Sequence, residues 1–451
     1  MQNDGSAPQA NELLPVDAWS VEQHKLPVLS CSVVVGLLAG LVGTLFQLSI
    51  GWTQQLLGQL PGWIPGVPSW LVAGAASALL VWGAILLVRS FAFEAAGSGI
   101  QEIEGALAGL RPARWARVLP VKFIGGLMSL SAGMGLGREG PTVQMGANLG
   151  QMLGRGLRLR SEQLHILLAA GAGAGISAAF NAPLAGILFV IEEMRPHFKY
   201  GFLSVQSVVI ASGMAALVLR SAVVWGLFAG QSPDIAIPQF EAPPLQSLGL
   251  FLLLGAMLGA IGFAFNATLV GTLNLYERLR RPLDNFRGLL VGAVIGVIGL
   301  SYPYVTGGGY KEIPWALSHQ SAAGGLLALF AARFVVTMAC YGCGAPGGIF
   351  APMLALATLF GTAFGIKAKE WFPALVANPG VFAVAGMGAL FAATVRAPLT
   401  GIVLTIEMTQ NYALILPLIL TCWGATIVAQ ALGARPIYTV LLERTLKGEK
   451  K

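Results

Sequence analysis

Long apolar runs, separated by short polar loops, recur along nearly the whole chain. The runs are continuous, whereas the strands of an outer-membrane barrel would give short stretches of alternating apolar and polar positions. A run of about 20 apolar residues is needed for one helix to cross a bilayer. The pattern therefore predicts an all-α polytopic membrane protein.

Composition supports this interpretation. The 451 residues are 55% hydrophobic and only 10% charged, and the mean hydropathy is +0.73, whereas a soluble domain carries about 25% charged residues. A soluble enzyme and a disordered scaffold are excluded. The net charge of +7 comes from basic residues in the loops between apolar runs, which is typical of cytoplasmic loops rather than of a nucleic-acid-binding face. All four cysteines lie in or beside apolar segments, so no disulfide framework is expected.

The basic residues predict a topology. The clusters are Arg111, Arg114 and Arg117; Arg155, Arg158 and Arg160; Arg195 and Lys199; Arg278, Arg280, Arg281 and Arg287; and the tail from Arg435 to Lys451. If all face the cytoplasm, residues 231–244, which lack Lys and Arg, form an outside loop, and Lys367 and Lys369 are the one exception. We expect a cytoplasmic N-terminal segment (1–26), a transmembrane transport domain (27–434) and a cytoplasmic basic tail (435–451).

Two stretches between these clusters are too short for ordinary crossings. Between Arg117 and Arg155 the chain must go out and back with about 15 apolar residues each way, fewer than a full crossing needs. The turn Gly137–Pro141 should therefore lie within the outer half of the membrane, where two short or tilted helices meet. Asn181-Ala182-Pro183 breaks the next such pair, which leaves Glu193 near the inner end.

The sequence contains an internal repeat. Leu168 to Glu193 matches Ala383 to Met408 at an offset of 215, with about a dozen of 26 positions identical. Pro141, Gly150 and Gly154 match Pro352, Gly361 and Gly365 at an offset of 211. The intervening segments give the copies opposite directions through the membrane, with repeats at roughly 68–220 and 286–433. An inverted-topology repeat is typical of a transporter whose site lies between the copies near the midplane.

Four Gly- or Pro-rich segments predict breaks in the helices: Gly97–Ile100, Gly137–Pro141, Gly344–Pro352 and the stretch before Tyr438. Glycine allows tight turns, and the N-terminus of a following helix offers unpaired N–H groups and a partial positive charge. Several such ends directed at one point would bind an anion. For any single glycine taken alone, close helix packing is the favoured explanation. Glu139 is different, because an ionisable group at membrane depth is by default functional.

GSGI at Gly97–Ile100, GREGP at Gly137–Pro141, GGIFAP at Gly347–Pro352 and the isolated Tyr438 occur in this order on the inverted repeat. Together they strongly resemble the CLC family of chloride channels and proton-coupled chloride antiporters, over about residues 25–445. The resemblance implies the CLC fold of short, tilted and broken helices. Gln101 stands where the family often has Pro. We expect a member of the prokaryotic type, without the C-terminal pair of nucleotide-binding domains of the large eukaryotic members.

The resemblance also implies an anion site. Ser98 and Tyr438 would donate hydroxyl hydrogen bonds to a central chloride, joined by the backbone N–H groups of Ile349 and Phe350. Outer anion positions would lie near the backbone of Arg138 and Gly140. Ser98 favours chloride over nitrate, since relatives that prefer nitrate tend to carry Pro there.

Two carboxylates would carry protons. By resemblance, Glu139 is the external gate and proton acceptor, whose carboxylate competes with chloride, and Glu193 is the internal proton-transfer residue. An ionised carboxylate in an anion path repels and displaces chloride, and protonation would release it. From the residues alone, Glu193 is explained equally well as a surface residue paired with Arg195.

The predicted function is proton-coupled chloride exchange rather than enzyme catalysis, without cofactor or metal. The expected partners are chloride, protons and membrane lipid but no nucleic acid, and the family implies a homodimer with one pathway per subunit and an interface near residues 184–194, 202–219 and 400–432. We expect the plasma (inner) membrane with both termini cytoplasmic. One alternative is a passive chloride channel of the same fold, which the presence of Glu193 disfavours. The other is a redox enzyme built on Cys340 and Cys343, but the paired membrane histidines of a haem enzyme are missing.

Overall fold

The computed structural model describes residues 18–194, 200–228, 237–279, 286–318 and 322–449, and the side chains of 18–25 are not discussed. The predicted polar segments 1–17 and 231–236 lie outside the described residues. So do four basic residues of the predicted topology and two of the tail: Arg195, Lys199, Arg280, Arg281, Lys450 and Lys451.

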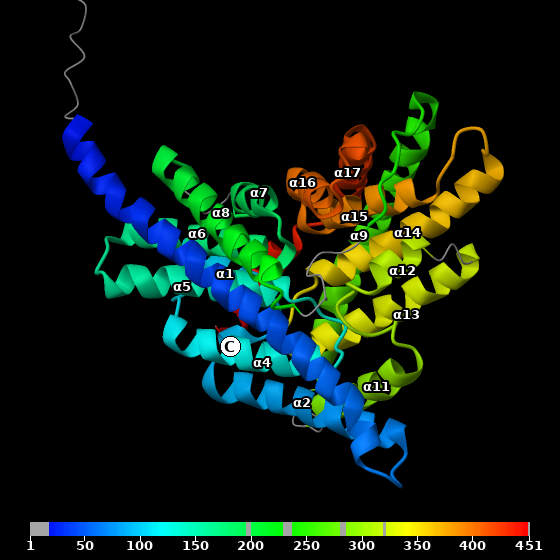
Figure 1. The fold of residues 1–451 in the computed structure, drawn as a ribbon, viewed down its shortest axis with the longest axis horizontal. Coiled ribbons are helices and arrows are strands. Elements are labelled where there is room, and N and C mark those ends of the chain that lie inside the picture. The colour runs from blue at the N-terminus through cyan, green and yellow to red at the C-terminus, as the bar shows by residue number, and fades with distance from the viewer. Residues whose placement is uncertain (1–17, 195–199, 229–236, 280–285, 319–321, 450–451) are drawn as a thin grey trace, which may run out of the picture.

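The chain folds into two sets of helices (Figure 1). The first set comprises α1 (Ala18–Trp63), α2 (Ser69–Phe91), α3 (Ile100–Leu107), α4 (Trp115–Ser131), α5 (Glu139–Gly156), α6 (Ser161–Phe180), α7 (Pro183–Glu192) and α8 (Phe202–Val224). The second comprises α9 (Leu248–Arg278), α11 (Arg287–Ser301), α12 (Glu312–Ser318), α13 (Ala323–Gly342), α14 (Phe350–Trp371), α15 (Gly380–Val395), α16 (Pro398–Thr409) and α17 (Ile415–Ala431), followed by α18 (Ile437–Glu449). Single 3₁₀ turns lie at Phe93–Ala95, Leu245–Ser247 and Tyr412–Leu414.

The helix lengths confirm the predicted fold class. Eight of the described helices are long and apolar enough to cross a membrane, and the described part of the chain contains no named strand. Four other apolar helices are shorter than a crossing requires: α7, α11, α15 and α16, with 10, 15, 16 and 12 residues. The molecule is therefore an all-α assembly of long, short and broken helices.

Helices begin at each of the predicted breaks. α3, α5, α14 and α18 start at Ile100, Glu139, Phe350 and Ile437. Gly99 precedes α3 with a φ of +84°, in the left-handed region that favours glycine. A side chain at Gly99 would also overlap the Gln144 side chain of α5. The glycine thus permits both the sharp start of α3 and its close approach to α5.

The two copies of the repeat make the same turn. Asn181 ends α6 and Arg396 ends α15, both in the left-handed conformation, with φ of 55° and 72°. Pro183 and Pro398 then begin α7 and α16, as suits a residue whose missing N–H is not needed in the first turn. A 215-residue offset in the sequence thus corresponds to equivalent positions in the fold.

The same equivalence holds for helix packing. A side chain at Gly150 of α5 would overlap the carbonyl of Leu167 in α6, and one at Gly361 of α14 would overlap the carbonyl of Phe382 in α15. Small residues let helix backbones touch in this way. α6 and α15 are mostly buried and pack on α8 and α17 respectively, so the α5–α6 and α14–α15 pairs form the core around which the outer helices pack.

The copies also cap each other. Glu192, at the end of α7, accepts hydrogen bonds from the N–H groups of the second and third residues of α16, Leu399 and Thr400, at 3.1 and 2.7 Å. Glu407, near the end of α16, accepts them from the N–H groups of the second and third residues of α7, Leu184 and Ala185, at 3.0 and 2.7 Å. Carboxylates satisfy unpaired N–H groups and complement the helix dipole. α7 and α16 are thereby joined side by side across the inverted repeat (Figure 1).

Candidate functional site

Three of the four predicted breaks are joined directly by backbone hydrogen bonds. Gly137 and Gly348 each donate to the other's carbonyl at 2.7 Å, and Gly347 donates to the carbonyl of Gly97 at 2.9 Å. Gly137 and Gly348 are equivalent residues of the repeat, so the axis that relates the copies passes between them. The N-terminal ends of α3, α5 and α14 therefore converge on one region at the interface of the copies.

Ser98 and Tyr438 come together in this region. Both residues are fully buried, and their hydroxyl groups interact electrostatically. Neither hydroxyl makes a hydrogen bond of good geometry with a protein group. Buried polar groups are nearly always hydrogen-bonded in folded proteins, so two adjacent hydroxyls without partners are suited to binding a ligand.

The start of α14 contributes backbone donors. Ile349 is the N-cap of α14 and Phe350 its first residue, and both are fully buried. The first N–H groups of a helix have no acceptor within it. The Phe350 ring packs on Phe391 and Phe180, with centroids 4.1 and 5.3 Å apart, which fixes the position of this helix end.

The start of α5 touches the same site. A side chain at Gly140 would overlap Ser98, so the backbone of α5 lies directly against the Ser98 loop. Arg138 precedes α5 as its N-cap, and its guanidinium lies 4.2 Å from the centroid of the Tyr310 ring. The predicted outer positions at Arg138 and Gly140 are therefore next to the Ser98 region.

Glu139 is the first residue of α5 and is fully buried. Its Oε1 accepts a hydrogen bond from the Tyr310 hydroxyl, and its Oε2 accepts one from the N–H of Ala351 at 3.4 Å. Ala351 is the second residue of α14, so the carboxylate occupies the N-terminus of α14. Such a terminus favours negative charge, and the carboxylate stands where a small anion would bind.

Glu193 lies at the C-terminal end of α7 and is only 8% exposed. Its carboxyl group contacts that of Glu104 in α3, which is 3% exposed. The predicted rival partner, Arg195, lies outside the described residues. The two carboxyl groups thus form a buried pair at the C-terminal end of α7.

A family model described as "Voltage gated chloride channel" matches residues 76–430. The chain belongs to this family. The match includes three of the breaks described above, those before α3, α5 and α14, and it confirms the family to which the sequence motifs pointed.

Curated relatives cover nearly the whole chain. The H(+)/Cl(-) exchange transporter ClcA of Vibrio cholerae is 52% identical over 444 residues, which cover 96% of this chain and 92% of the relative. The ClcA of Klebsiella pneumoniae is 50% identical, covering 94% and 91%. The crystal structure of a slow cyanobacterial Cl-/H+ antiporter matches with a TM-score of 0.89 at 44% identity, covering 94% of this chain and 99% of that one. Like other members of the voltage gated chloride channel family, this chain is an integral membrane protein.

Four residues near the family site were missed by the sequence interpretation. They are Glu104, Lys122, Gln144 and Tyr310. Lys122 is fully buried in α4 and donates to the carbonyls of Ala95 and Gly97, at 3.1 and 2.7 Å, so it holds the backbone that leads to Ser98. A lysine inside an apolar run was a signal for this position. Nothing local in the sequence marks Tyr310.

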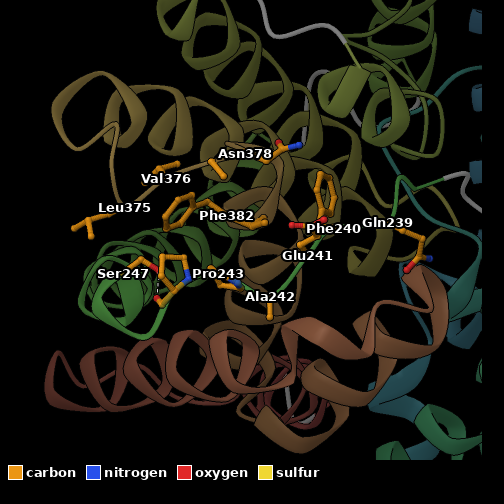
Figure 2. Close-up of a pocket in the computed structure, with 13 residues that line it drawn as sticks. Gln239, Phe240, Glu241, Ala242, Pro243, Ser247, Leu375, Val376, Asn378 and Phe382 are labelled. Atoms are coloured by element: carbon orange, nitrogen blue, oxygen red, sulfur yellow. Dashed lines mark hydrogen bonds between the residues drawn. The ribbon is translucent and has the colours of Figure 1, made fainter.

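Two further features are the cysteine pair Cys340 and Cys343 and a cavity in the second set of helices. Cys343 donates to the carbonyl of Cys340 at 3.1 Å, and Cys340 accepts from the N–H of Gly135 at 3.3 Å. Both are free, buried cysteines. A cavity of about 350 Å³ lies between the segments 239–247 and 375–382 (Figure 2). It shares no lining residue with the candidate site.

Proposed function

We propose that this protein exchanges chloride for protons across a membrane. The observation that carries the proposal is the position of Glu139, whose carboxylate lies across the N-terminus of α14 where the anion-binding groups of three helices converge. The names of the close relatives, H(+)/Cl(-) exchange transporters, support the same function. The protein would be a transporter, with no chemical conversion of its substrates.

The central chloride would be held without a cationic side chain. Ser98 and Tyr438 offer buried hydroxyl donors, and the first N–H groups of α14, at Ile349 and Phe350, offer backbone donors. Neutral donors bind an anion strongly enough to replace its water but weakly enough to release it, as conduction requires. Arg138 and Gly140 would contribute backbone groups to the outer position.

Glu139 would be the gate of this pathway. While ionised, its carboxylate takes the anion position at α14 and blocks chloride. When a proton from outside neutralises it, the helix end loses its anionic ligand, the side chain leaves, and chloride enters. The ionised Glu139 carboxylate and chloride are thereby alternative occupants of the same position, and chloride enters when Glu139 is protonated.

Glu193 would connect this gate to the inside. The Glu193–Glu104 pair is buried near the end of α7 and is suited to holding and passing a proton. Tyr438 interacts electrostatically with both Glu193 and Glu139, so it is near enough to influence both carboxylates. The proton and chloride routes would therefore share the centre of the protein and separate toward the inner side.

The pathway would lie within the transmembrane domain of a homodimer. The transport domain would occupy residues 27–434 of a plasma (inner) membrane protein whose termini, 1–26 and 435–451, are both cytoplasmic, with repeats at roughly 68–220 and 286–433. The protein would be a homodimer with one pathway per subunit, surrounded by lipid. Large apolar side chains are exposed on α7, α8, α16 and α17, including Leu184, Phe202, Leu399, Leu416, Trp423 and Ile427, and these would form the interface.

The test is transport by the purified protein in lipid vesicles. A chloride gradient is imposed while an electrode records protons in the outer solution. Exchange predicts that chloride flow drives protons uphill, against their own gradient. If chloride flows and the proton signal stays flat at neutral and acidic pH, the protein is a passive channel of the same family.

A further inference from the structure

Tyr310 contacts the proposed gate but has no role in the exchange cycle described above. It lies between α11 and α12, and its hydroxyl donates a hydrogen bond to Oε1 of Glu139. The opposite oxygen of the same carboxylate bonds to the start of α14. The carboxylate is therefore held from two sides, by a helix end and by a side chain from a separate segment.

The segment that carries Tyr310 is firmly fixed. The buried Arg333 of α13 donates to three carbonyls of residues 304–307, at 2.8, 3.0 and 2.9 Å. Arg333 also pairs with the buried Glu312 at 2.9 Å, so both ends of the segment are tied to one guanidinium. The N–H of Gly307 donates to the carbonyl of Gly133 at 2.8 Å. The segment that carries Tyr310 is thus held by contacts that do not involve the Glu139 carboxylate.

The ring of Tyr310 is fixed as well. The Arg138 guanidinium lies over it at 4.2 Å, within the range of a cation–π interaction, and a side chain at Gly308 would come within 3.1 Å of it. The ring could not turn away without breaking these contacts. The hydroxyl is therefore a fixed donor directed at Glu139.

We propose that Tyr310 is a positioning residue that holds the ionised Glu139 carboxylate in its blocking position and thereby sets the rate and the pH dependence of exchange. The inference rests on the proposed function, in which Glu139 is the gate. A hydroxyl bonds more strongly to a charged carboxylate than to a neutral carboxyl group. Tyr310 thus favours the blocked state while Glu139 is ionised and releases the side chain once it is protonated.

The groups that surround the Glu139 carboxylate come from several parts of the fold. The titratable and charged groups that face it are Arg138 at the start of α5, Tyr438 of α18 and Tyr310, and the N–H of Ala351 comes from α14. Behind Tyr310, Arg333 and Glu312 neutralise each other. Among the described side chains, the hydrogen bond to Oε1 comes from Tyr310.

Tyr310→Phe removes the hydroxyl and keeps the ring beneath Arg138. A hydrogen bond to a charged group is worth about a factor of ten or more in an equilibrium. Chloride turnover at neutral pH should therefore rise roughly tenfold. The flux–pH curve should shift to higher pH by about one unit, because the ionised form loses its donor and protonation releases the gate more readily. The number of protons moved per chloride should stay the same.

Two matched variants isolate the hydroxyl's effect. Tyr304→Phe makes the same change in the same segment, where the ring stacks on Trp315 at 4.6 Å, and should leave turnover and the pH curve unchanged. Tyr310→Phe is also made in a Glu139→Gln background, where the ionised carboxylate is missing. If Tyr310 acts through Glu139, the added change has no effect there.

The outcomes separate the two proposals. Faster, upward-shifted flux in Tyr310→Phe that disappears in the Glu139→Gln background supports the inference. An unchanged or slower turnover, or the same effect in both backgrounds, overturns it and leaves the exchange function intact. Full proton coupling in Glu139→Gln alone overturns the gate itself, and with it both proposals.

Discussion

The two copies of the inverted repeat share a framework and differ in chemistry. Both have the left-handed turn at Asn181 or Arg396, the same glycine contacts between core helices, and a carboxylate that caps the other copy. In the first copy, however, α5 begins with Glu139, while α14 begins with Phe350. At the end of the next short helix, Glu193 of the first copy corresponds to Met408 of the second.

This difference explains how a nearly symmetric scaffold can carry two substrates. Packing needs small residues and satisfied helix ends, and these are needed equally in both copies. Proton transfer needs titratable groups, and one copy supplies Glu139 and Glu193. The second copy supplies backbone donors at α14 and an apolar wall at Phe350. The proposed anion site therefore uses both copies, whereas the proposed proton route uses the carboxylates of one.

The largest expected effect is at the inner carboxylate. Glu193→Gln should abolish proton transport and leave chloride flux, because the amide cannot carry the proton and the residue is off the chloride route. Met408→Gln places the same amide side chain at the equivalent position of the other copy and should keep full coupling. Vesicle flux with simultaneous proton recording measures both. Loss of coupling in Met408→Gln, or its retention in Glu193→Gln, would contradict the assignment of proton transfer to one copy.

An intermediate effect is expected at Tyr438. A hydrogen bond to a charged group is worth about 1.5–3 kcal/mol, so Tyr438→Phe should weaken central anion binding roughly tenfold. Tyr438→Ala also removes the bulk on the inner side of the site, so protons moved per chloride should fall further than in Tyr438→Phe. Anomalous scattering from bromide in crystals should be weakest at the centre in Tyr438→Ala. A wild-type exchange ratio with full central bromide in that variant would make Tyr438 a structural residue.

The smallest effect tests the framework the copies share. Glu192→Gln and Glu407→Gln each remove the charge from a reciprocal helix cap, and such a charge at a helix N-terminus contributes about 0.3–1 kcal/mol. Because the caps are equivalent, the thermal unfolding midpoint in detergent should fall by a similar small amount in both variants. Coupling should be unaffected in both. A large drop in only one variant would show that the caps are not equivalent.

The fold class and the breaks could be predicted because their causes are local. Glycine and proline determine the backbone conformation within a few residues, and the length of an apolar run determines whether a helix can cross the membrane. The two copies of the repeat can be recognised because their sequences match. The residues of the site were harder to predict from the sequence. Tyr310 and Glu139 are 171 residues apart, and no pattern near Tyr310 indicates that its hydroxyl meets a carboxylate.

Glu104 illustrates the same limit. It follows the predicted GSGI break by a few residues, yet only the packing of α3 near the end of α7 brings it to Glu193. Lys122 was easier to identify from the sequence, because a lysine within an apolar run needs a partner. Its carbonyl partners at Ala95 and Gly97, however, come from another segment. Motifs thus identify the groups that meet at helix ends, whereas side chains contributed by distant helices need the structure.

The most direct test of the account is Glu139→Gln in reconstituted vesicles, with chloride and proton movements recorded together. Glutamine resembles the protonated carboxyl group but cannot release a proton. The account predicts that chloride flows at every pH, that its rate no longer depends on pH, and that a chloride gradient moves no protons. Proton movement driven by chloride in this variant would contradict the claim that this carboxylate couples the two ions.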